Sequence, residues 1–120
     1  AVLDVAPEET KSYGIVSVDD DKQRTSPMRG IVEKPDPAVA PSRLAVIGRY
    51  VFEPEIFDYL EATQPGIAGE IQLTDGVSVS LETVPTYAHR FEGKRFDCGS
   101  KQGFLDATIN YARKRGFVIR

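Results

Sequence analysis

The chain has 120 residues and a mass of 13.2 kDa, the size of a single domain with one hydrophobic core. Apolar residues make up 41% and charged residues 28%, which excludes long disorder and collagen-like composition. The net charge of −3 argues against general attraction to nucleic acid or anionic lipid. The single cysteine, Cys98, cannot form an intrachain disulfide, and no apolar run is long enough to span a bilayer. A soluble, cytoplasmic protein without a nucleic-acid or membrane partner is therefore expected.

The first residues indicate a strand that is already under way. Residues 1–5 lack an initiator methionine and have the composition of a β-strand, and a polar turn over 6–10 follows them. A strand needs neighbours to pair its backbone groups and bury its face. We therefore expect residues 1–120 to be a single partial domain, a piece of a longer chain whose missing part lies upstream.

Three further strands are predicted in the first half of the chain, the first two of them forming a hairpin. A strand over 13–18 leads into an exposed hairpin loop over 19–27, which contains no large apolar residue, and a return strand follows over 28–34. The β-branched and aromatic content of residues 43–52 predicts another strand, in which Gly48 indicates a bulge or a close backbone approach.

The second half of the chain predicts helices on either side of one more strand. Pro54 suits the first turn of a short helix, and a second helix is expected over 70–81, although a glycine and β-branched residues weaken it. A strand is expected over 84–91. The clearest helix signal comes last, between an N-capping Ser100 and a C-capping Gly116.

This order of elements indicates an α/β sheet domain with an antiparallel portion. The predicted strands outnumber those that the helices can cover on both faces, which again fits half of a larger sheet. An unpaired strand edge and an uncovered apolar face favour association between chains. We therefore expect a homo-oligomer.

The residue inventory disfavours several well-marked classes of enzyme. One histidine and one cysteine leave no Cys/His zinc site, and the acidic run 19–21 lacks the glycine and distal glutamate of a calcium loop. His89 is interpreted as a structural residue of its strand. Neither a nucleophile elbow, a phosphate-binding P-loop nor a dinucleotide-binding glycine fingerprint is present.

Glu33 and Lys34 place a carboxylate and an ammonium at the end of a predicted strand, where Pro35 forces the chain to leave. Neighbours in a strand point to opposite faces unless a bulge or kink re-aims one of them. Strand ends are where ligands gather in open α/β sheets. A solvated strand end explains the same residues, so both interpretations stay open.

Asp97 lies between an aromatic residue and a Cys-Gly pair, immediately before the last predicted helix. Its carboxylate either helps to cap that helix or holds a hard cation near bound phosphates. The second interpretation is reasonable because Mg²⁺ takes only one or two protein carboxylates. The residues alone leave both open.

Five motifs in series resemble the bacterial UTP–glucose-1-phosphate uridylyltransferases, also called UDP-glucose pyrophosphorylases. The resemblance runs from about Ser12 to Tyr111. The motifs are, in order, Tyr-Gly-Ile-Val at 13–16, Val-Glu-Lys-Pro at 32–35, Ala-Val-Ile-Gly-Arg-Tyr at 45–50, Gly-Glu-Ile-Gln-Leu-Thr-Asp at 69–75 and Phe-Glu-Gly-Lys-Arg-Phe-Asp-Cys-Gly at 91–99. The last two favour the uridylyl enzymes over their thymidylyl relatives.

The resemblance implies the C-terminal, sugar-binding half of a nucleotide-diphospho-sugar transferase fold. This is a Rossmann-like α/β/α arrangement, with a mixed sheet and flanking helices. The implied reaction joins UTP and glucose 1-phosphate into UDP-glucose and pyrophosphate, with Mg²⁺ as cofactor. No protein nucleophile is needed, because the sugar phosphate itself attacks.

The resemblance also implies roles for individual residues. The backbone at Gly14 lies against the sugar, Glu33 accepts hydrogen bonds from its hydroxyls, and Val46 forms part of an apolar wall under the ring. Lys34 is the catalytic cation that neutralises the sugar phosphate. Asp97 is one of two aspartates on Mg²⁺.

Several family features do not occur in this sequence and are expected upstream of it. They are the glycine-rich nucleotide loop, the uracil-reading residues and the other metal aspartate. We therefore do not expect turnover from this chain alone. A thymidylyl or other sugar-1-phosphate nucleotidyltransferase is one alternative, and a stand-alone module that binds a sugar phosphate without catalysis is another.

Overall fold

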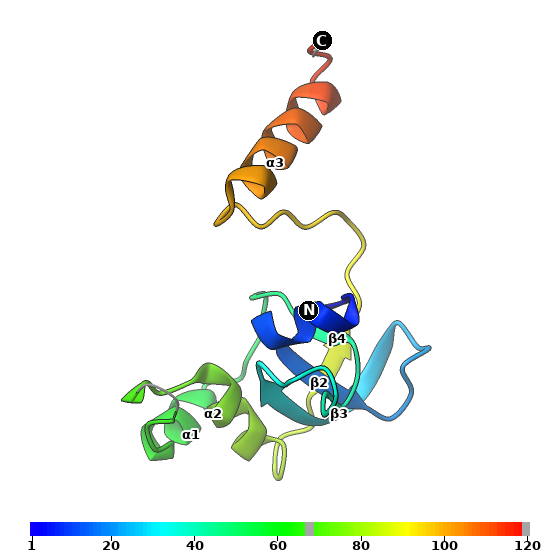
Figure 1. The fold of residues 1–120 in the computed structure, drawn as a ribbon. Helices are drawn as coiled ribbons and strands as arrows, with labels where there is room; N and C mark the ends of the chain where they lie inside the picture. Colours follow the sequence, from blue (N-terminus) through cyan, green and yellow to red (C-terminus); the bar gives the residue numbers. More distant parts are fainter. Residues whose placement is uncertain (67–68, 119–120) are drawn as a thin grey trace.

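A computed structural model describes residues 1–66 and 69–118. Its principal extents are 52 × 34 × 34 Å, because a body built of a sheet and two helices carries a third helix on an extended segment (Figure 1). Among the described residues, none of the helices has both the length and the hydropathy needed to cross a membrane.

Five strands form one curled sheet in the order β1-β4-β2-β3-β5. They are β1 (Val2–Asp4), β2 (Gly14–Val18), β3 (Thr25–Glu33), β4 (Leu44–Val46) and β5 (Tyr87–His89). All of their ladders are antiparallel, and an isolated parallel bridge outside the ladders links Val2 to Arg90. This bridge brings β1 against the chain that leaves β5, so the sheet curls toward closure rather than leaving β1 as a fully open edge.

The centre of the sheet is buried on both faces. Ile15 and Val16 are neighbours in β2 and point to opposite faces, yet both are fully buried. Val16 belongs to the main core with Leu44 and Val77, whereas Ile15 packs with Val5 and Ala45 in a second, smaller cluster. A 3-10 helix over Pro7–Ser12 packs against β2 in place of the expected polar turn.

Two short helices cover the main core. The first is α1 (Ile56–Ala62), and the second, α2 (Leu73–Ser80), packs against both α1 and β3. Gly76 permits this packing, because a Cβ atom at that position would lie 2.6 Å from Cδ2 of Leu60. A glycine that lowers helix propensity therefore lets two helices approach closely.

The strand expected over 43–52 ends at Val46, so the second part of that prediction was wrong. Gly48 adopts a φ of 69°, with open space around its Cα, and turns the chain out of the sheet instead of permitting a close approach. Beyond the turn, Tyr50 stacks on Phe52 with ring centroids 5.1 Å apart. Aromatic content therefore reflected side-chain stacking here rather than strand pairing. The strand expected over 84–91 is likewise shorter.

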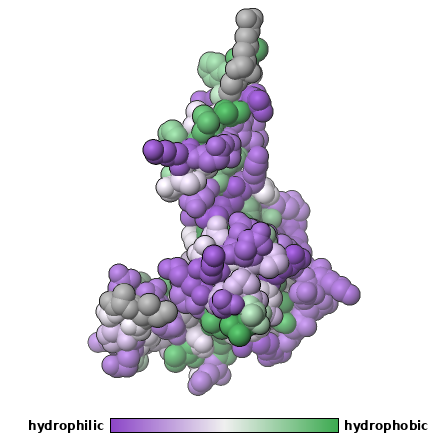
Figure 2. Space-filling view, viewed as in Figure 1, coloured by the Kyte–Doolittle hydropathy of each residue, from purple (hydrophilic) through white to green (hydrophobic). Residues whose placement is uncertain are grey.

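The last helix, α3 (Lys101–Lys114), begins as the sequence predicts. The hydroxyl of Ser100 accepts a hydrogen bond from the backbone N–H of Gly103 at 3.0 Å, and Gly116 follows the helix with a φ of 81°. None of its described side chains is buried, and its apolar residues lie on the surface of the projecting part (Figure 2). Exposed apolar side chains therefore occur on α3, and also on the sheet, where Val32 and Tyr87 are 48% and 59% exposed.

Candidate functional site

Gly14, at the start of β2, is the point where three other segments converge. A Cβ atom at Gly14 would lie 2.9 Å from Cγ2 of Thr74, 3.0 Å from Cγ2 of Val46 and 3.2 Å from Oε2 of Glu33. A larger residue would displace side chains of β3, β4 and α2 together. The structure thus brings together Gly14, Glu33 and Val46, three of the residues that the sequence singles out.

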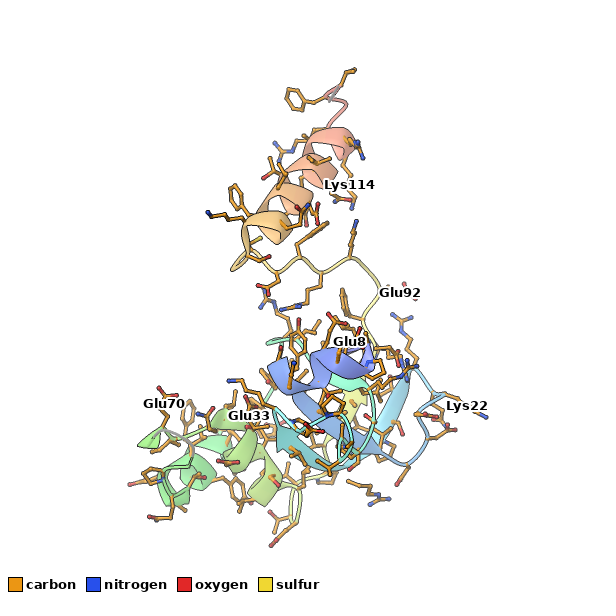
Figure 3. All side chains as sticks on the ribbon, in the orientation of Figure 1. Glu8, Lys22, Glu33, Glu70, Glu92 and Lys114 are labelled. Atoms are coloured by element: carbon orange, nitrogen blue, oxygen red, sulfur yellow. The ribbon has the colours of Figure 1, made fainter. Side chains whose placement is uncertain are left out.

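The sheet register explains this convergence. Gly14 is the direct partner of Glu33 in the β2–β3 ladder, and Val46 ends β4, the strand on the other side of β2. Figure 3 shows Glu33 on the side of the sheet that faces α2, which contributes Thr74 from its first turn. The four residues come from four different elements, held by the buried core beneath them.

Lys34 has a backbone kink, the feature that could re-aim one of the two neighbours at this strand end. Its φ of 47° is the one positive value at a non-glycine residue of the described chain, and its N–H donates to the carbonyl of Tyr13 at 3.0 Å. This conformation lets Nζ of Lys34 lie 3.6 Å from Oε1 of Glu33, although strand neighbours normally point apart. Such a backbone costs about 1–3 kcal/mol and is concentrated at functional sites.

Thr74 is a site residue that the sequence reasoning missed. It is 7% exposed, and within the described residues its hydroxyl is a buried polar group without a hydrogen-bond partner. An unsatisfied buried hydroxyl costs about 1–3 kcal/mol. The fourth motif contains Thr74, but nothing in its spacing indicated that the Thr74 side chain packs against Gly14, with its methyl group facing the glycine.

Tyr50 also lies near Glu33. Burial raises the pKa of the Tyr50 phenol above its ordinary value of 10.0, and the nearby Glu33 carboxylate raises it further. The phenol is therefore held in its protonated form and can donate a hydrogen bond. Sequence reasoning placed Tyr50 inside a regular strand and gave it no role.

Asp97 lies outside this cluster, on the extended segment before α3. One carboxylate oxygen, Oδ1, accepts a hydrogen bond from the N–H of Gly99 at 3.1 Å, while the backbone carbonyl accepts from the N–H of Ser100 at 3.3 Å. The side chain that caps α3 belongs to Ser100. The carboxylate of Asp97 therefore shapes a local turn and remains exposed to solvent.

A metal ligand set is only partly supplied by this chain. Within residues 1–66 and 69–118, the structure contains no group of three or more His, Cys, Asp or Glu side chains able to hold a metal. A lone carboxylate nevertheless fits Mg²⁺, which keeps several waters and takes further ligands from substrate phosphates. Asp97 fits as one such ligand and does not make a complete site.

Taken together, the cluster suits a ring rich in hydroxyl groups that carries an anion. Glu33 can accept hydrogen bonds, the Thr74 hydroxyl has no partner within the described residues, Val46 offers an apolar contact, and the side chain of Lys34 is 58% exposed. A cavity of about 250 Å³ between α1 and β5 is lined by none of these residues, whereas Val46 lines a smaller cavity of about 60 Å³.

The residues interpreted as structural make local contacts. His89 Nδ1 and the Thr25 hydroxyl are 2.7 Å apart across the β3–β5 ladder, where the two residues are register partners. In the acidic hairpin, Asp19 pairs with Arg29, and Asp20 accepts a hydrogen bond from the N–H of Lys22 at 2.9 Å. These contacts shape the sheet and its loop.

Comparison with known proteins assigns the class. The nucleotidyl transferase family model matches residues 1–114, and the chain belongs to this family. Its curated relatives are UTP–glucose-1-phosphate uridylyltransferases. That of Pseudomonas aeruginosa strain PAO1 is 48% identical over 111 residues, and that of Bacillus subtilis strain 168 is 48% identical over 111 residues. These matches cover 90% and 92% of this chain but only 39% and 38% of the relatives, so the chain spans well under half of their length.

Solved structures agree. A UDP-glucose pyrophosphorylase in complex with UDP-glucose is 40% identical with a TM-score of 0.87, and it matches 94% of this chain and 43% of its own. A UTP-bound enzyme of the same name from Acinetobacter baumannii is 41% identical with a TM-score of 0.81, over 94% of this chain and 39% of its own. The expected family and fold class are confirmed.

Proposed function

We propose that this chain forms the sugar-phosphate-binding part of an enzyme that makes UDP-glucose and pyrophosphate from UTP and glucose 1-phosphate. The observation that carries the proposal is the cluster at Gly14, where the side chains of Glu33, Val46 and Thr74 converge and where, within the described residues, the buried Thr74 hydroxyl has no hydrogen-bond partner. A sugar hydroxyl supplies the missing partner. The ammonium of Lys34, 3.6 Å from Glu33, is placed for an attached phosphate.

In this mechanism the protein binds and orients, and the substrate reacts. Glu33 and Thr74 hold sugar hydroxyls, Val46 packs under the ring, and Gly14 leaves room for it. The phosphate oxygen of glucose 1-phosphate forms a bond to the α-phosphorus of UTP, and the bond to pyrophosphate breaks. Lys34 reduces the repulsion between the two anions, which lowers the barrier without a covalent enzyme intermediate.

We further propose Mg²⁺ as cofactor, with Asp97 as one of its ligands. Bound to the phosphates, Mg²⁺ supplies charge neutralisation for the departing pyrophosphate. This chain would contribute a hard carboxylate oxygen, from Asp97, on the segment in which Arg95 contacts Tyr13. The other ligands of the ion would be phosphate oxygens, water and groups that this chain does not contain.

The nucleotide is assigned as UTP because the relatives at 48% identity carry uridylyltransferase names. A thymidylyl enzyme is the competing possibility. An assay of the complete enzyme with UTP and TTP separates the two, and a strong preference for TTP rules out the uridylyl assignment.

An amide NMR titration of this chain with UDP-glucose and Mg²⁺ tests the proposed site. Shifts are expected at Gly14, Glu33, Lys34 and Asp97. Lys34→Ala is expected to weaken binding by about tenfold or more, because a hydrogen bond to a charged group contributes about 1.5–3 kcal/mol. Lys22→Ala, which removes a lysine from the exposed hairpin, is the matched control and leaves the affinity unchanged. A folded sample without shifts contradicts the proposal.

Thr74→Val separates binding from stability. The substitution keeps the shape of the side chain and removes a buried hydroxyl that has no partner in the described structure. We expect unchanged or higher stability against urea, together with a loss of UDP-glucose affinity of several-fold, about 1 kcal/mol. A loss of stability with unchanged affinity shows that the hydroxyl is a structural group.

We also propose that the chain self-associates through α3, in the cytoplasm. Phe104, Leu105 and Tyr111 are 63%, 50% and 57% exposed, and α3 carries three cations and one carboxylate whereas the chain as a whole is net −3. Outside α3 the chain is therefore net acidic, and the basic, apolar helix of one copy complements that net charge in another. Light scattering is expected to show an oligomer that weakens with added salt, and a monomer at high concentration contradicts it.

A further inference from the structure

Tyr13 connects three chain segments that carry candidate site residues. It precedes Gly14, and its backbone carbonyl accepts the hydrogen bond from the N–H of Lys34 at 3.0 Å. Its side-chain hydroxyl accepts a second hydrogen bond, from Nη1 of Arg95 at 2.7 Å. The guanidinium carbon of Arg95 also lies 4.9 Å from the centre of the Tyr13 ring. Arg95 in turn stands two residues before Asp97.

Arg95 is the point at which the extended segment is fastened to the body. Lys94 lies over the ring of Phe96, and Phe96 contacts Tyr111 of α3, so these side chains interact within the segment or with the helix it leads to. Between Gly93 and Gly99, the hydrogen bond that reaches the body in the described structure is that of Arg95 to Tyr13.

The chemistry of this contact suits positioning. A guanidinium can stack on an aromatic ring and donate a directed hydrogen bond at the same time, which a lysine ammonium cannot do in the same geometry. Together the two interactions restrain both the distance and the direction of the segment relative to Tyr13. The contact spans 82 positions in the sequence, so no local element accounts for it.

We propose that Tyr13 and Arg95 form a positioning pair that holds the carboxylate of Asp97 beside the ligand bound at Gly14 and Lys34. Neither residue needs to touch the reacting atoms. The effect of the pair on ligand binding rests on the proposed function, because the ligand in question is the sugar phosphate. The placement itself is a property of the free chain and can be measured without any ligand.

The placement is tested with a nitroxide label on Cys98, which is exposed and is the single cysteine of the chain. Paramagnetic broadening of amide signals falls steeply with distance from the label. The labelled chain is expected to show broadening at Gly14 and Lys34. Arg95→Met removes the stacking cation and the donor, and we expect the broadening at both amides to be lost.

Two further variants make the test specific. Lys94→Met removes the neighbouring charge, which does not contact Tyr13, and is expected to leave the broadening intact. Tyr13→Phe keeps the ring and removes the acceptor, and is expected to reduce the broadening partly. Unchanged amide shifts in the core, for example at Val16, show that each variant is folded. Broadening that is absent in the parent chain, or that persists in Arg95→Met, overturns the proposal.

The unlabelled chains provide the functional readout. With the pair intact, Mg²⁺ is expected to increase the affinity for UDP-glucose; in Arg95→Met the increase is lost while the affinity without Mg²⁺ is retained. If Mg²⁺ raises the affinity equally in both chains, the pair does not position Asp97. If the parent chain binds no UDP-glucose at all but shows the broadening, the proposed function fails and the placement by Tyr13 and Arg95 stands.

Discussion

The body, which consists of the sheet with α1 and α2, and the projecting helix α3 are stabilised by different interactions. Ile15, Val16 and Ala45 of the body are fully buried at the centre of a sheet covered on both faces. In α3 no described side chain is buried, and the helix relies on its own backbone bonds, its Ser100 cap and the contact of Phe96 with Tyr111. One region is fixed by tertiary packing and the other by local interactions.

The residues proposed to bind the sugar and the residue proposed to bind Mg²⁺ lie in regions that are stabilised differently. Gly14, Glu33 and Val46 stand on strands whose positions the core determines, so the cluster at Gly14, the proposed sugar-binding site, is preorganised. Asp97 stands on the segment toward α3, where, among the described residues, the hydrogen bond to the body between Gly93 and Gly99 is that of Arg95 to Tyr13. The core that fixes the cluster at Gly14 therefore does not fix Asp97, the proposed metal ligand, which depends on the contact between Tyr13 and Arg95.

The largest expected effect comes from the core of the body. Leu44 is 2% exposed and packs in the main cluster, so Leu44→Ala is expected to lower the free energy of unfolding by about 2–5 kcal/mol. Phe104→Ala in α3 removes a larger side chain that is 63% exposed, and in protein too dilute to self-associate it is expected to change the stability of the body by less than about 0.5 kcal/mol. Urea unfolding followed by circular dichroism measures both.

If Leu44→Ala and Phe104→Ala lower the stability equally, the two regions do not differ in how they are stabilised. If Phe104→Ala destabilises the body as strongly as Leu44→Ala, then α3 packs on a surface in solution, within one chain or between copies. A dependence of that effect on protein concentration assigns it to the contact between copies.

The sequence could predict those parts of the fold that depend on local patterns. The hairpin of β2 and β3 follows from alternation on either side of a polar loop, and α3 follows from its cap and apolar stripe. It could not predict where β4 ends, because the left-handed turn at Gly48 and the stacking of Tyr50 on Phe52 are tertiary features. Likewise, Gly76 lowers the helix propensity of α2, yet contact with Leu60 requires it.

The candidate site shows the same limit. The register of one hairpin already pairs Gly14 with Glu33, so their proximity could be predicted from the sequence. Thr74 reaches the cluster through the packing of α2 on β3, which no spacing encodes. The sequence left open whether a kink re-aims Lys34; in the structure the kink is accompanied by the long-range hydrogen bond from its N–H to the carbonyl of Tyr13.

An intermediate effect is expected at the start of α3. Ser100→Ala removes the acceptor for the N–H of Gly103 and is expected to lower the stability of the helix by about 1 kcal/mol. Isolated helices of this length are marginal in water, so the loss is expected to appear as faster amide hydrogen exchange across α3. Exchange in β2 and β3 is expected to be unchanged. Faster exchange in both regions shows that they unfold as one unit.

The smallest expected effect concerns the curled sheet itself. Arg90 donates from Nε to Oδ2 of Asp4 at 2.9 Å, next to the parallel bridge that brings β1 against the end of β5. This hydrogen bond lowers the pKa of Asp4 below its ordinary value of 3.8, and the charge of Arg90 adds to the effect, while partial burial opposes it. The side chain of Asp4 is 54% exposed, so the pair is expected to contribute only about 0.2–1 kcal/mol.

The pH dependence of Asp4→Asn isolates this contribution. Because the folded-state pKa is depressed, the stabilisation is complete at pH values well above 3.8 and is lost as the pH falls through the folded-state pKa. The parent chain is therefore expected to be more stable than Asp4→Asn at neutral pH, and the difference in urea midpoint is expected to vanish in acid. Asp19→Asn is the matched control, since Asp19 pairs with Arg29 within one hairpin and does not join β1 to the end of β5. A larger loss from Asp19→Asn, or a difference for Asp4→Asn that persists in acid, shows that the Asp4–Arg90 pair does not hold the sheet in its curled form.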